Sequence, residues 1–150
     1  MVFLTATFAF GQGQDHSPDL FNYGMLMHLA ISDRIVQKIE AAGQPSKAAR
    51  DHAKQETGLT DAQQAILVRY ANQFYAANMA MFSARDAALQ ANDAKGAQQA
   101  EQAFHTSAVS LIQALKDELG PGAWGTLQSN AHKNFSPVIK DITHSKKGGN

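Results

Sequence analysis

The chain has 150 residues, with 13 Lys or Arg and 13 Asp or Glu, so its formal net charge is zero. That length suits one domain with a real hydrophobic core. The balanced charge argues against broad electrostatic binding to nucleic acid. The absence of cysteine excludes a thiol nucleophile, a cysteine-ligated metal site and covalent c-type haem attachment. No apolar run reaches the roughly 18 to 20 residues that a transmembrane span needs.

Residues 1–16 begin with an apolar segment, MVFLTATFAF, and continue as the polar stretch GQGQDH. The apolar part is similar to the hydrophobic region and tail of a secretory signal peptide without its basic start. We therefore expect residues 1–16 to be a signal-peptide remnant of a periplasmic or secreted protein. The alternative is a retained, flexible N-terminal arm whose apolar side chains need a partner surface. These side chains are Phe3, Leu4, Phe8 and Phe10.

The first predicted helix begins at Ser17, because Ser17, Pro18 and Asp19 form a strong helix start. Gly43 is placed to end this helix. Apolar side chains recur along it at three- and four-residue spacing, and we expect this stripe to face the core. The stripe comprises Leu20, Gly24, Met27, Ile31, Ile35 and Ile39, and Met25, Leu29 and Val36 widen it.

A shorter polar helix is predicted from Ser46 to about Glu56, closed by Gly58. The longest helix then opens with a capping box formed by Thr60 and Gln63. No Gly or Pro interrupts residues 59–95, and the helix either breaks at Asn92-Asp93 or runs through that pair. Its predicted core stripe comprises Ile66, Tyr70, Phe74, Ala77, Met81, Ala84 and Ala88, with Leu67, Ala71, Asn78 and Phe82 beside it.

Two further helices are predicted after residue 95, separated by the terminator Gly120-Pro121-Gly122. Ser136-Pro137 kinks the last of them or caps a final turn. Residues 144–150 have nothing to bury and are predicted to be a disordered tail. No segment alternates apolar and polar residues, so no strand is expected. We therefore predict an all-α bundle of four to five helices over residues 17–143. The apolar positions of these two helices are Ala97, Ala100, Phe104, Ala108, Leu111 and Leu115, then Trp124, Leu127, Ala131 and Phe135.

One candidate ligand set combines methionine and histidine. Thioether sulfur with imidazole suits copper(I), and the set comprises Met25, His28, Met79 and Met81. Met25 and His28 share a helix face, whereas Met79 and Met81 diverge. Core packing is the more common role for such methionines. His105, with a methionine from the first helix, is an alternative ligand pair for non-covalent b-type haem.

The sequence shows no catalytic arrangement. Carboxylates do not cluster, the residues of a zincin or di-iron motif are missing, and no serine lies in a nucleophile elbow. The glycines at 11 and 13 lack the lysine and the preceding strand of a phosphate loop. We therefore predict a protein that is not an enzyme and has no cofactor.

Two resemblances bear on function. The string Leu59-Thr60-Asp61-Ala62-Gln63 resembles the LTxxQ motif of Spy-like periplasmic stress proteins. Those proteins are small, exported and all-helical, and they act as dimeric, ATP-independent chaperones. The resemblance therefore implies a chaperone of this kind. The stretches YGMLMHL (residues 23–29) and LGPGAW (residues 119–124), with the helix start after Gly58, are similar to a set of uncharacterised exported helical bacterial proteins.

Apolar stripes on nearly every helix, without a catalytic arrangement, lead to one main hypothesis. We expect an exported, non-enzymatic helical bundle that binds proteins or assembles with itself as a homo-oligomer, in a chaperone-like role. One alternative is a copper- or b-type-haem-binding bundle that uses the residues named above. Another is a structural subunit of a larger assembly, in which the N-terminal arm docks into a neighbour.

Overall fold

The computed structural model describes residues 17–144, and the side chains of residues 20–135. The predicted N-terminal arm, residues 1–16, therefore lies outside the described residues, as do residues 145–150 of the predicted tail. His144, the first residue of that predicted tail, is instead the last residue of a helix. Within the described range the chain forms four helices and no strand. They are α1 (Ser17–Ala41), α2 (Lys47–Thr57), α3 (Asp61–Gln90) and α4 (Ala94–His144). The prediction of an all-α bundle is confirmed.

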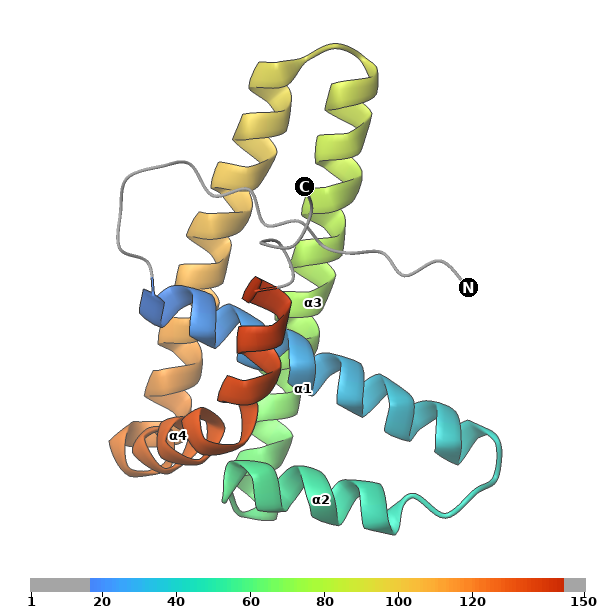
Figure 1. Ribbon diagram of the computed structural model, residues 1–150, viewed down its shortest axis with the longest axis vertical. Helices are drawn as coiled ribbons and strands as arrows, with labels where there is room; N and C mark the ends of the chain where they lie inside the picture. The colour runs from blue at the N-terminus through green and yellow to red at the C-terminus, as the bar shows by residue number, and fades with distance from the viewer. Residues whose placement is uncertain (1–16, 145–150) are drawn as a thin grey trace.

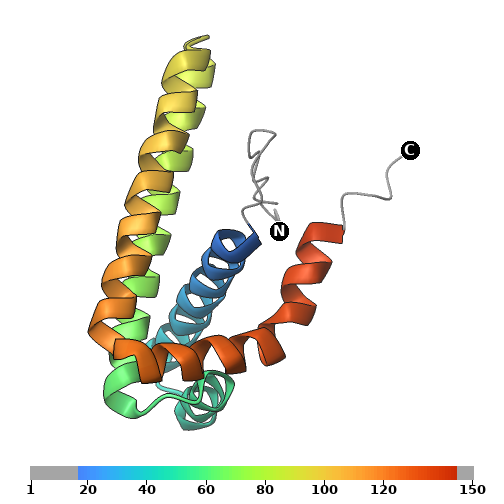
Figure 2. The ribbon, with the colours of Figure 1, turned by 90° about the vertical axis from the view of Figure 1, so that its left-hand side faces the viewer.

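The helices are arranged around a long antiparallel pair made by α3 and the first half of α4 (Figure 1). Helix α1 crosses this pair near its middle, and α2 returns beneath α1 toward the base of α3. The second half of α4 runs across the base and then turns back alongside α1 (Figure 2). None of the described helices is long and apolar enough to cross a membrane.

The helix ends follow the predicted local signals. Gly43 has a φ of 70°, and its N–H donates to the Glu40 carbonyl at 2.9 Å while the Gln44 N–H donates to the Ile39 carbonyl at 3.1 Å. This pair of bonds satisfies the last carbonyls of α1 and requires a left-handed residue, which glycine provides without strain. At the start of α3 the Gln63 N–H donates to the Thr60 hydroxyl, and the Thr60 N–H donates to the Gln63 side chain.

The chain breaks between α3 and α4 rather than running through as one helix. Asn92 has a φ of 57°, a conformation that asparagine tolerates better than most residues. Asp93 then caps α4, because its carboxylate accepts the Gly96 N–H at 2.8 Å. Of the two outcomes that the sequence left open, the break is the one that forms.

Helix α4 changes direction at Gly120, whose φ of 78° and ψ of 163° are not helical. Pro121 follows directly and suits a first helical position, because it needs no backbone N–H there. The predicted terminator is therefore confirmed. Helical backbone resumes and continues through Ser136-Pro137 to His144, so that pair does not end the helix.

The core lies where α1, α3 and both halves of α4 meet. The large side chains of this core are almost completely removed from water, and burial of apolar surface is the main source of stability in such a bundle. The largest fully buried apolar side chains are Tyr23, Phe74, Phe135, Met25, Leu26, Leu67, Leu115 and Leu127.

The prediction of which α1 face is buried was wrong. Leu20, Ile31 and Ile35 are 39%, 46% and 53% exposed, although the spacing assigned them to the core. The buried residues of α1 include Leu29 and Val36, which were expected only to widen the stripe. The reason is that α1 is apolar on more than half of its circumference, so periodicity alone does not choose between two adjacent faces.

The prediction of the buried face of α3 was also partly wrong. Leu67, Ala71 and Asn78, which were placed beside the stripe, are fully buried. Ala84, the last but one position of the predicted stripe, is exposed, and Ala88 at its end is half-buried. That end of α3 extends beyond α1 and has only α4 as a neighbour (Figure 1), so it has fewer side chains to cover it.

Candidate functional site

A groove of about 660 Å³ opens between α1, α2 and α3. This volume falls within the range of sites that bind small ligands or side chains. Small alanine side chains of α2 and α3 leave space in the groove, and branched side chains of α1 and α3 supply the rest of its apolar surface. This apolar lining includes Leu29, Ile35, Val36, Ala53, Ala65 and Val68.

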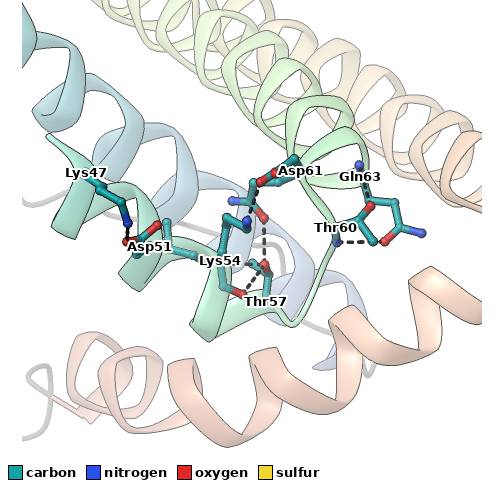
Figure 3. Close-up of polar contacts among 9 residues, drawn as sticks. Lys47, Asp51, Lys54, Thr57, Thr60, Asp61 and Gln63 are labelled. Carbon is teal, nitrogen blue, oxygen red and sulfur yellow. Dashed lines mark hydrogen bonds and ion pairs between the residues drawn. The ribbon is translucent and has the colours of Figure 1, made fainter.

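A tight turn between α2 and α3 sets the position of α2 beside the groove (Figure 3). Gly58 closes α2 with a φ of 69°, and its N–H donates to the Lys54 carbonyl at 2.8 Å. Thr57 is fully buried, and its hydroxyl donates to the Gln64 side chain at 2.7 Å. Lys54 of α2 also forms an ion pair with Asp61 at the start of α3. These contacts tie the end of α2 to the first turn of α3.

The second support for α2 is the corner between α1 and α2. The Arg50 guanidinium donates two hydrogen bonds to the Glu40 carboxylate, at 2.7 and 2.8 Å, and the Ser46 hydroxyl also donates to it. The hydrogen bond from Ser46, followed by that from Arg50, holds the pKa of Glu40 below its ordinary value. The carboxylate of Glu40 therefore joins the last turns of α1 to α2.

Acidification should loosen this corner. Since the folded-state pKa of Glu40 is lowered, its stabilising contribution is present above the ordinary value of about 4.5 and is lost as pH falls through the lower folded value. The protection of the amides of residues 41–47 against hydrogen exchange, measured relative to the intrinsic exchange rate at each pH, should therefore fall on acidification. Glu40→Gln should show the lower protection already at neutral pH. Asp86→Asn, on α3, should not, and equal exchange in all three proteins would refute this role of Glu40.

The other charged groups around the groove are also paired. Arg69 forms an ion pair with Glu118 of α4, and Tyr70 donates to the same carboxylate at 2.9 Å. The hydrogen bonds from Arg69 and Tyr70 hold the pKa of Glu118 below its ordinary value. Asp33 accepts hydrogen bonds from Gln37 at 2.6 Å and from Asn72 at 2.9 Å. The rim thus carries ion pairs and one carboxylate, that of Asp33, which is held by two amide groups, around an apolar interior.

The predicted metal ligands lie in different surroundings. Met25 is fully buried, and Met81 belongs to the same core cluster at 8% exposure. Met79 is 47% exposed on α3. The His28 Nε2 lies 3.9 Å from the Glu56 carboxylate, and its ring packs against Phe135 with centroids 4.8 Å apart. Within the described range, no group of three or more His, Asp or Glu side chains could hold a metal ion.

His105, the predicted haem ligand, lies against the aromatic core. The Tyr23 hydroxyl donates to the His105 Nδ1 at 2.9 Å when that nitrogen carries no proton. The Tyr23 ring also contacts Phe74 and Phe104, with centroids 5.3 and 6.1 Å apart. The structure therefore shows His105 in a hydrogen bond that joins α4 to α1.

Two features of the structure were missed from the sequence, namely the groove and the buried side chain of Asn78. The groove depends on how far the alanine-bearing faces of α2 and α3 stand from α1, and residue spacing does not give that distance. Asn78 is fully buried, and its Oδ1 has no hydrogen-bond partner among the described residues. Its Nδ2 donates weakly to the Met27 sulfur at 3.7 Å. The sequence signal that could have indicated the burial of Asn78 was its position beside the predicted core stripe of α3.

Comparison with protein families, characterised proteins and solved structures finds no match to this chain. The class of protein is therefore defined by the fold alone, as an all-α helical bundle with an open groove.

Proposed function

We propose that this protein is a non-enzymatic, protein-binding helical bundle that receives apolar side chains of a partner chain beside α1. The observation that carries the proposal is the groove, together with Ile35 at its edge and the exposed Ile31 that precedes it on α1. Ile35 lines the groove and is 53% exposed, and Ile31, one turn earlier, is 46% exposed. Covering such half-exposed side chains contributes about 1 kcal/mol each.

A protein segment suits this surface better than a small polar substrate. The interior of the groove is apolar, and the neighbouring ion pairs already satisfy Arg50, Lys54 and Arg69. A polar substrate would have to displace one of these pairs to gain a partner. An apolar side chain can enter without breaking them.

The proposal includes export and a chaperone-like role. Export is supported by the apolar composition of residues 1–10. The chaperone-like role is supported by the resemblance of residues 59–63 to the LTxxQ motif. Self-association through the same surface is the other form that protein binding could take, and the measurement below separates it from client binding.

The test compares matched substitutions of exposed apolar residues in a light-scattering assay with an aggregating, unfolded test protein. In this assay the aggregating test protein is the client, and the measured quantity is the concentration of the bundle that halves client aggregation. Ile35→Gln should raise this concentration about fivefold, because a side-chain burial worth about 1 kcal/mol is lost. Val109→Gln is the control, since Val109 is 44% exposed on α4 and does not line the groove.

Two results would contradict the proposal. One is no suppression by the unmodified protein, and the other is equal suppression by the unmodified protein and Ile35→Gln. Analytical ultracentrifugation of the unmodified protein, Ile35→Gln and Val109→Gln shows whether the exposed apolar residues beside the groove instead join copies of the chain. A stable oligomer that Ile35→Gln dissociates, without any effect on the client, would establish self-association in place of client binding.

A further inference from the structure

Two cations that have no carboxylate partner among the described residues lie beside the exposed isoleucines of α1. Arg34 and Lys38 are four residues apart and share a face of the helix. At about 100° per residue, Ile31, Arg34, Ile35 and Lys38 all fall within an arc of about 100°. Neither Arg34 nor Lys38 forms an ion pair with any of the described residues, and both are exposed. We refer to these four residues as the α1 outer face.

Arg34 is held in place without being neutralised. Its guanidinium carbon lies 4.1 Å from the centre of the Tyr75 ring on α3. Stacking on an aromatic ring leaves the N–H groups at the edge of the guanidinium plane available to a carboxylate. Lys38 lies in the last turn of α1. The nearby carboxylates are engaged elsewhere, because Asp33 is bonded to Gln37 and Asn72, and Glu40 to Arg50.

We propose that the α1 outer face binds an apolar protein segment that carries carboxylates. Its apolar side chains would cover Ile31 and Ile35, and its acidic side chains would pair with Arg34 and Lys38. The inference rests on the proposed function and adds the charge of the partner to it. It is local, since the chain as a whole has no net charge and would not attract acidic partners at long range.

Charge also argues against two other occupants of the same face. A second copy docked symmetrically would bring its own Arg34 and Lys38 toward the same cations, which is repulsive. An anionic membrane is bound by larger basic clusters, and this face offers only two cations. An acidic, apolar protein segment is the occupant that matches both the isoleucines and the unpaired charges.

The test uses fluorescence anisotropy of three labelled amphipathic peptides with one leucine pattern, whose polar positions are Glu, Gln or Lys. The Glu peptide should bind several-fold more tightly than the Gln peptide, and the Lys peptide most weakly. Removing both cations in Arg34→Gln/Lys38→Gln should weaken the Glu peptide about fivefold, a loss expected for two exposed ion pairs. The double variant should leave the Gln peptide unchanged. Lys95→Gln, at the start of α4, is the control and should change nothing.

The outcomes separate this inference from the proposed function. Equal binding of the Glu, Gln and Lys peptides, with loss of binding in Ile35→Gln, would overturn the acidic preference and leave protein binding intact. No binding of any peptide, together with no suppression of client aggregation, would overturn both the acidic preference and the proposed protein binding. Binding of the double variant equal to that of the unmodified protein would also overturn the role of the two cations. Anionic vesicles that bind the protein while the Glu peptide does not would replace the protein segment by a membrane.

Discussion

Replacing Phe74 by alanine should lower the free energy of unfolding by about 3–5 kcal/mol. Phe74 is fully buried where α1, α3 and α4 meet. Its ring lies 5.3 Å from the centre of Tyr23 on α1 and 5.4 Å from that of Phe104 on α4. Alanine would leave a cavity that three helices would have to close together, so little of the loss is recovered by local relaxation. Urea unfolding followed by helical circular dichroism measures the change.

Phe74→Leu is the matched control, because leucine keeps most of the buried volume and loses the ring contacts. It should lose clearly less stability than Phe74→Ala. A loss below about 1 kcal/mol for Phe74→Ala would contradict the assignment of Phe74 to the core. Domains of this size have a total stability of roughly 5–15 kcal/mol, so Phe74→Ala is also expected to populate unfolded chains at physiological temperature.

Replacing Gly58 by alanine should be the second large effect, at about 2–3 kcal/mol. A left-handed conformation costs an L-residue about 1–2 kcal/mol, and Gly58 has a φ of 69°. The new Cβ would also lie 2.5 Å from the Asn130 side-chain nitrogen and 3.3 Å from the Thr126 methyl. Asn130 would have to move away from the Thr126 carbonyl, to which it donates at 2.9 Å, and losing that bond costs about 1 kcal/mol.

Gly43→Ala separates these two costs. Gly43 has almost the same φ, 70°, but nothing lies within 4 Å of its added Cβ. It should therefore show the backbone cost alone, measured by the same urea unfolding. Because the turn at Gly58 positions α2 beside the groove, Gly58→Ala should also weaken client suppression, whereas Gly43→Ala should weaken it less. Equal destabilisation by both variants would show that the contact with Asn130 carries no energy.

The helix boundaries could be predicted because their signals are local. Glycines with positive φ end α1 and α2, and the Thr60–Gln63 capping box starts α3. Each depends on a few neighbouring residues and on backbone conformations that few residue types adopt. The break at Asn92 was left open, since asparagine permits a turn without requiring one.

The buried face of α1 and the groove could not be predicted in the same way, because both depend on tertiary packing. Apolar residues cover α1 so widely that the spacing placed Ile31 in the core stripe and Val36 only beside it, whereas packing against the other helices buries Val36 and leaves Ile31 exposed. The role that we propose for Arg34 and Lys38 followed only from that outcome. A cation beside a buried stripe is an ordinary flanking residue, whereas beside an exposed one it becomes part of a surface.

The course of folding during synthesis follows from where the neighbours of α1 lie in the chain. Asn22 accepts a hydrogen bond from Gln128 at 2.9 Å, and Phe21 stacks on His132 with ring centroids 3.8 Å apart. Helix α1 is thus completed by residues synthesised more than a hundred positions later, whereas α3 and α4 meet through a short turn. Local contacts form faster than distant ones, so the α3–α4 hairpin should assemble while α1 still lacks part of its cover. A chain that ends at Gly120 would lack the partners of Phe21 and Asn22, so this part of α1 is covered only by the segment beyond that bend.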